Sequence, residues 1–152
     1  MQEMMGWESA YREVGDFEGP PPWNIGEPQP ELAAVIRAGK VRSDVLDVGC
    51  GCAELSLTLA AEGYTVHGID LAPTAIAAAT RSAADRGLRS VTFQRADVTT
   101  IAGFDGRINT VVDSALFWKA HRTTIGHGKP ATTMYGRNTV QCNGSHITTG
   151  KY

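Results

Sequence analysis

The chain has 152 residues, of which 42% are hydrophobic and 20% charged, and its net charge is −2 at pH 7. This length fits one modest domain, and the composition is that of an ordinary globular protein, which argues against a disordered chain. Neither a basic start nor a long apolar run follows Met1, so we expect no secretory signal and no membrane-spanning helix. The expected location is the cytoplasm, where the three cysteines would stay reduced.

Metal and nucleic-acid sites are disfavoured by the spacing of the candidate residues. Cys50 and Cys52 form one close pair without a second pair of ligands, and the histidines after residue 116 match no metal-binding spacing. Residues 116–152 contain basic residues and no acid, but these are scattered singly and form no dense patch. We therefore expect no metal and no nucleic-acid partner.

Short apolar runs alternate with helical stretches from residue 45 onward. Residues 18–30 are rich in proline and indicate a connector, and residues 31–38 have the apolar spacing of an amphipathic helix. The later pattern predicts strands at 45–48, 65–70, 91–96 and 110–115, and helices at 53–62 and 73–86. Such alternation is typical of βαβ units, so the predicted fold class is α/β, a Rossmann-like doubly wound parallel sheet.

The chemistry is expected in the turn that follows the strand at 45–48. Gly49 and Gly51 lie two positions apart there, which allows the backbone to approach a ligand closely at the carboxyl end of the strand. The spacing alone predicts only a nucleotide-like cofactor. A dinucleotide fingerprint requires a third small residue where this chain has Glu54, so a nicotinamide or flavin oxidoreductase is disfavoured.

The run D-x-G-x-G-x-A, from Asp47 to Ala53, resembles the first motif of the class I S-adenosylmethionine-dependent methyltransferases, with Ala53 in place of the usual third glycine. The resemblance implies that Asp47, Gly49, Gly51 and Ala53 hold the methionine end of S-adenosylmethionine. The carboxylate of Asp47 would then favour the positive sulfonium.

Two further matches follow in chain order. Asp70, with Leu71 after it, ends the second strand, and Asp97, with Val98, follows the third. In the family these positions bind the ribose hydroxyls and the adenine amine, respectively. A lone Gly-x-Gly is more often a simple turn and a strand-ending acid more often a helix cap, but the ordered set of three favours the family.

The amino-terminal segment resembles the lead-in of small-molecule methyltransferases of the thiopurine and tellurite-resistance type, through residues 7–12 and 21–30. In those proteins the segment lies over the cofactor. Trp23 would then stack on the cofactor or exclude water from it; equally, it covers a helix surface. The methyl acceptor is implied to be a small molecule.

The family pattern stops after Trp118. The fourth strand carries Asp113 and Ser114, which would touch the acceptor, but the remaining strands of the family are missing. We expect a truncated or frameshifted chain whose fourth strand is an open edge, prone to self-association. The tail would be detachable, although Asn143 and Gly144 predict a hairpin within it.

The chain is thus divided into a lead-in segment (1–30), an S-adenosylmethionine-binding core (31–118) and an atypical polar tail (119–152). The predicted function is a small-molecule methyltransferase, weak or inactive as this short chain. The alternative is a non-catalytic cofactor-binding or interaction fragment. Methyl transfer depends mainly on proximity and desolvation, so no catalytic side chain is assigned.

Overall fold

The computed structural model describes residues 2–14, 19–20, 24–28, 30–97, 100, 102–104, 107–113, 139–142 and 145–148. Its helices are α1 (Gln2–Tyr11), α2 (Pro30–Arg37), α3 (Glu54–Ala61) and α4 (Pro73–Asp85). Its strands are β1 (Val45–Val48), β2 (Val66–Asp70), β3 (Val91–Arg95), β4 (Thr110–Asp113), β5 (Thr139–Cys142) and β6 (Ser145–Thr148). None of the described helices is long and apolar enough to cross a membrane.

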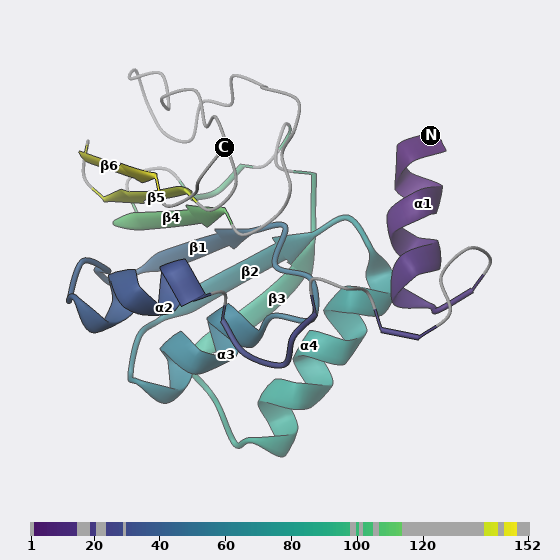
Figure 1. The fold of residues 1–152 in the computed structure, drawn as a ribbon, viewed down its shortest axis with the longest axis horizontal. Helices are drawn as coiled ribbons and strands as arrows, with labels where there is room; N and C mark the ends of the chain where they lie inside the picture. Colours follow the sequence, from purple (N-terminus) through teal and green to yellow (C-terminus); the bar gives the residue numbers. More distant parts are fainter. Residues whose placement is uncertain are drawn as a thin grey trace.

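One six-stranded sheet, in the order β3-β2-β1-β4-β5-β6, organises the molecule (Figure 1). The first four strands are parallel, and β5 and β6 are antiparallel additions at one side. Because the chain passes from β3 across the sheet to β4, the direction of winding changes between β1 and β4. Ligands of open α/β sheets bind outside the carboxyl ends of the strands at such a point. The predicted α/β, Rossmann-like sheet is confirmed.

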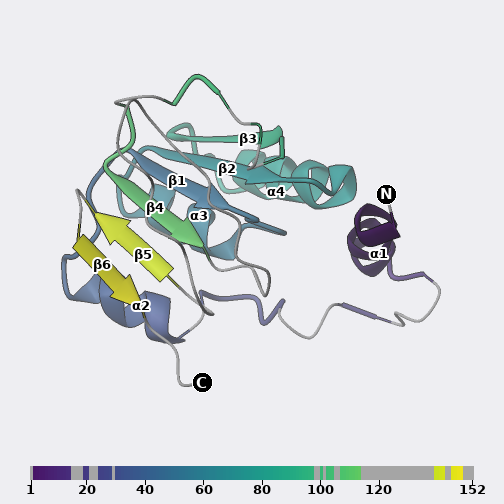
Figure 2. The ribbon, with the colours of Figure 1, turned by 90° about the horizontal axis from the view of Figure 1, so that it is seen from above.

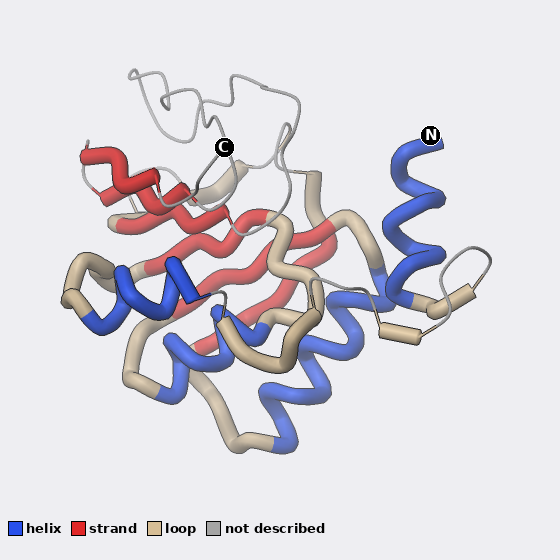
Figure 3. Tube along the Cα trace, in the orientation of Figure 1, coloured by secondary structure: helices blue, strands red, loops and turns tan. Residues whose placement is uncertain are grey.

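The helices α2, α3 and α4 lie on the same face of the sheet, as Figures 1 and 3 show. Leu32, Val35 and Ile36 of α2 pack with Leu57 and Leu59 of α3 in one buried cluster. The opposite face carries Leu46, Val48 and Ile69, which are also buried. Strands covered on both faces read as continuous apolar runs, which is why the parallel strands were recognisable from the sequence.

The amino-terminal helix α1 was not predicted. It lies beside the first turn of α4, away from the other helices, as the two views in Figures 1 and 2 agree. Among the α1 residues whose burial is described, Ala10 is buried. The apolar periodicity of these residues is weak, so a helix could not be predicted from local pattern.

The expectation of an open edge at β4 is wrong. Strand β4 pairs with β1 on one side and with β5 on the other, with Val112 opposite Val140. The two tail strands lie on either side of Asn143 and Gly144, as the predicted hairpin requires, and they pair with each other as well. The polar tail therefore closes an edge that would otherwise present unpaired backbone groups.

This pairing predicts the effect of ending the chain at Trp118, which removes β5 and β6. Backbone amides in a strand alternate between its two neighbours, so the β4 amides that face β5 should lose hydrogen-exchange protection while those that face β1 keep it. The denaturant midpoint should fall as well. The full chain, measured under the same conditions, is the control. Unchanged exchange at all four β4 residues would show instead that the tail is detachable, as the sequence had led us to expect.

Candidate functional site

The loop between β1 and α3 turns through three residues in the left-handed region. Gly49, Gly51 and Ala53 have φ values of 66°, 56° and 69°. Glycine adopts this conformation without a steric penalty, whereas an alanine costs roughly 1 to 2 kcal/mol. The amide of Cys50 also donates to the carbonyl of Ile69 in β2, at 2.9 Å. The geometry explains the glycine spacing and shows that Ala53 is a strained substitute for a third glycine.

Asp70 joins this loop to the loop that follows β2. Its Oδ2 accepts the Gly51 amide and its Oδ1 accepts the Ala72 amide, each at 2.9 Å. Burial raises the pKa of Asp70, the amide hydrogen bonds from Ala72 and Gly51 oppose that rise, and the charge of Glu8 adds to it. One carboxylate therefore fixes the relative position of two turns at the carboxyl edge of the sheet.

Asp47 is buried beneath the loop rather than exposed on it. Its side chain is fully inaccessible, and its Oδ2 accepts a 2.6 Å hydrogen bond from the Ser56 hydroxyl of α3. Its Oδ1 has no hydrogen-bond partner among the described residues. Burial raises the pKa of Asp47 from 3.8 to about 7; the Ser56 hydrogen bond opposes this, and the charge of Asp70 adds to it. The carboxyl keeps one acceptor atom without a partner.

Gly68 and Cys50 pack close together next to the glycine loop. In the parallel register Gly68 lies beside Asp47, and a Cβ on it would approach the Phe93 ring to 2.6 Å and the Cys50 Sγ to 3.1 Å. The Cys50 thiol is buried, and burial raises its pKa well above the ordinary value of a thiol. This thiol is a packing group, and Gly68 provides the space that the Phe93 ring fills. The sequence analysis did not identify this role of Gly68.

Two side chains of α1 also reach this edge, and the sequence analysis did not assign them to the site. The Glu8 carboxylate accepts hydrogen bonds from the amide and the hydroxyl of Thr74, at the start of α4. The Tyr11 hydroxyl lies against the glycine loop, 2.6 Å from the position that a Cβ on Gly51 would take. The resemblance over residues 7–12 was the available signal, because it placed this segment above the cofactor.

The structure describes only part of the remaining predicted site residues. Leu71 follows Asp70 at the edge, and its carbonyl accepts the Arg95 Nε at 3.1 Å. Asp97 is exposed after β3, and its carbonyl accepts the Thr100 amide at 3.1 Å. Asp113 ends β4. The side chain of Asp113, together with Trp23, Val98 and Ser114, lies outside the described residues.

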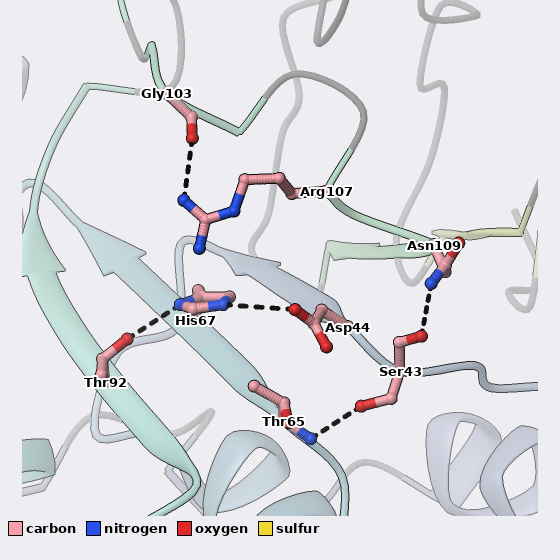
Figure 4. A network of polar contacts seen from close by, with 8 residues as sticks. All are labelled: Ser43, Asp44, Thr65, His67, Thr92, Gly103, Arg107 and Asn109. Atoms are coloured by element: carbon pink, nitrogen blue, oxygen red, sulfur yellow. Dashed lines mark hydrogen bonds and ion pairs between the residues drawn. The ribbon is translucent and has the colours of Figure 1, made fainter.

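The opposite end of the sheet holds a separate polar network (Figure 4). His67 of β2 contacts the Thr92 hydroxyl at 2.9 Å and lies 4.0 Å from the Asp44 carboxylate. The Ser43 hydroxyl accepts the Thr65 amide at 2.8 Å, and the Asn109 side chain donates to the Ser43 carbonyl. These contacts connect the amino-terminal ends of the parallel strands, whereas the glycine loop lies at their carboxyl ends.

The buried carboxyl of Asp47 predicts a pH-dependent stability. Its pKa in the folded chain lies above the unfolded value, so the folded state binds the proton more tightly and the free energy of unfolding falls as pH rises from about 4 to about 7. Asp47→Asn keeps the shape and an acceptor for Ser56 but cannot ionise. Between pH 5 and 8 the natural chain should therefore lose about 2 kcal/mol more than this variant.

Urea titrations at each pH, without ligand, measure the difference. Asp85→Asn, on the exposed end of α4, is the matched control and should follow the natural chain. Parallel pH profiles for Asp47→Asn and the natural chain would mean that Asp47 is ionised throughout this range.

Comparison with known proteins agrees with the geometry. A family model described as a methyltransferase domain matches residues 45–126. The 2-heptyl-1-hydroxyquinolin-4(1H)-one methyltransferase of Mycobacteroides abscessus is 50% identical over 119 residues, which cover 77% of this chain and 52% of that protein. The ribosomal RNA small subunit methyltransferase C of Alcanivorax borkumensis is 35% identical over 81 residues, or 53% of this chain and 24% of that protein.

A solved structure from work on the conversion of a disulfide bond into a thioacetal group during echinomycin biosynthesis has a TM-score of 0.71 and 43% identity, over 75% of this chain and 47% of that chain. The chain thus spans about half the length of the quinolone-methylating relative. The matched domain, the identity and the sheet topology together show that the chain belongs to the class I S-adenosylmethionine-dependent methyltransferase family.

Proposed function

We propose that this chain binds S-adenosylmethionine at the carboxyl edge of β1 and β2 and is the cofactor-binding part of a methyltransferase that acts on a small molecule. The observation that carries the proposal is a group of carboxyls that repel one another. Burial and, to a smaller extent, the charge of Asp70 raise the pKa of Asp47; burial and, to a smaller extent, the charge of Glu8 raise the pKa of Asp70. A cation relieves this repulsion, whereas a pyrophosphate increases it.

The residues present fit this cofactor. The orphaned Oδ1 of buried Asp47 leaves an acceptor for a positive group, and Gly49 and Gly51 let the backbone take the left-handed turn that a close approach to a ligand needs. We assign the methionine end to Asp47, Gly49, Gly51 and Ala53. The assigned ribose contacts are Asp70 and Leu71, and the assigned adenine contacts are Asp97 and Val98. Trp23 is assigned to cover the cofactor.

The cofactor supplies an electrophilic methyl group on a sulfonium. The part of this chain is to hold that methyl in line with the acceptor and to exclude water, with Tyr11 placed at the glycine loop and Asp113 and Ser114 at the acceptor side. The small-molecule acceptor is supported by the quinolone-methylating relative. The proposed organisation keeps residues 31–118 as the cofactor core, with residues 1–30 above it.

Two expectations from the sequence are kept as proposals. Self-association through β4 is proposed only for a chain whose hairpin has left the sheet, since β5 occupies that edge here. The cytoplasmic location stays a prediction from the sequence, and the reduced state of the three cysteines is expected to follow from it.

Replacing Asp70 tests the proposed site. Asp70→Ala should weaken S-adenosylhomocysteine binding by about 2 to 3 kcal/mol, because a charged acceptor of hydroxyl hydrogen bonds is lost and the glycine loop loses its anchor. Titration calorimetry measures the change. Asp85→Ala, on the exposed end of α4, is the matched control.

The two variants separate a ligand contact from a capping role. Equal affinities for Asp70→Ala and Asp85→Ala would remove Asp70 from the site. Binding of the cofactor by the natural chain without methyl transfer to any quinolone acceptor would identify a cofactor-binding unit without activity of its own. No binding by the natural chain would overturn the proposed function.

A further inference from the structure

Glu8 of the amino-terminal helix hydrogen-bonds to the start of α4 at the cofactor edge. Its Oε2 accepts the Thr74 amide at 3.1 Å and its Oε1 accepts the Thr74 hydroxyl, across 66 positions of sequence. The first turn of a helix leaves amides without partners, and Ala72, at the N-cap of α4, makes no side-chain cap. A carboxylate is favoured at this end of a helix by both the free amides and the dipole. Glu8 therefore caps α4 from another helix.

The same helix places Tyr11 at the glycine loop. Residues three apart lie on one face of a helix, so the contacts of Glu8 and Tyr11 are mechanically linked. The Tyr11 hydroxyl lies 2.6 Å from the position of a Cβ on Gly51, and the Gly51 amide is held by Asp70. The contact between Glu8 and Thr74 thus determines the position of the Tyr11 hydroxyl at the Gly51 loop.

We propose that Glu8 is a positioning residue that acts through Tyr11: by clamping α1 onto Thr74, it holds the Tyr11 hydroxyl at the Gly51 loop and so sets the affinity for the cofactor. This inference rests on the proposed function, because the affinity concerned is that for S-adenosylmethionine and its demethylated product. Both oxygens of the Glu8 carboxylate accept from Thr74, and the proposal assigns Glu8 no contact with the cofactor.

A double-mutant cycle with the full chain tests this proposal. Titration calorimetry with S-adenosylhomocysteine compares the natural chain, Glu8→Gln, Tyr11→Phe and the double variant. Glu8→Gln should weaken binding about 10-fold, the scale of one lost charge-assisted hydrogen bond. In the Tyr11→Phe background the same change should cost less than about 2-fold, because the group that Glu8 positions is absent.

Two controls separate positioning from folding. Glu62→Gln, an exposed glutamate at the end of α3, should leave the affinity unchanged. Thr74→Val removes the hydroxyl donor alone and should weaken binding. Thr74→Ser keeps a hydroxyl donor and should bind with the affinity of the natural chain. Urea midpoints for every variant show whether the fold is retained.

The outcomes are distinct. Equal losses from Glu8→Gln in both backgrounds, or no loss in either, would overturn the positioning role while leaving the cofactor site intact. Weakening by Glu8→Gln that Thr74→Val does not reproduce would also overturn the clamp. Absence of binding by the natural chain would overturn the proposed function itself, and the clamp as a determinant of affinity with it.

Discussion

The Asp70 carboxylate is the interaction on which the arrangement of this edge depends. It accepts one amide from the loop after β1 and one from the loop after β2, so two turns that lie far apart in sequence share a single acceptor. Charge-assisted hydrogen bonds of this kind are stronger than neutral ones. The left-handed turn at Gly49 and Gly51 directs the Gly51 amide to Asp70, and the sheet order places both turns where the winding changes direction.

The arrangement has a cost in stability. Asp47 is fully buried, and among the described residues only one of its oxygens has a hydrogen-bond partner. Asp70 adds negative charge beside it, and Glu8 adds negative charge beside Asp70. A chain selected for stability alone would place an amide or an apolar residue at position 47. Ala53 adds backbone strain in the turn. Such costs are typical of functional sites, and they support the cation site proposed at this edge.

The sequence predicted the parts of the fold that follow from local pattern. Alternation of apolar runs with helical stretches located β1 to β4, α3 and α4 within a residue or two, and the glycine pair with its following acids located the carboxyl edge. The methyltransferase family followed from the same residues. The Asn143-Gly144 turn signal also predicted the two tail strands.

Long-range contacts were beyond local pattern. Nothing near residues 139–142 indicates that they pair with β4, so the edge was expected to be open. The position of α1 depends on Glu8 meeting Thr74 across 66 positions, and the need for glycine at position 68 depends on the Phe93 ring from another strand. The depth of Asp47 within β1 was also missed, because acidic residues are rarely fully buried. Each of these features depends on which elements become neighbours.

The most direct test of the account is to follow the backbone amide resonances while S-adenosylhomocysteine is added to the chain. We expect the largest shifts at Gly51 and Ala72, whose amides both donate to Asp70, with further shifts at Gly49 and Tyr11. The amides of Thr65 and Asn109, at the opposite end of the sheet, should not move. Shifts confined to that opposite end, with none at Gly51 and Ala72, would contradict the assignment of the cofactor to this edge.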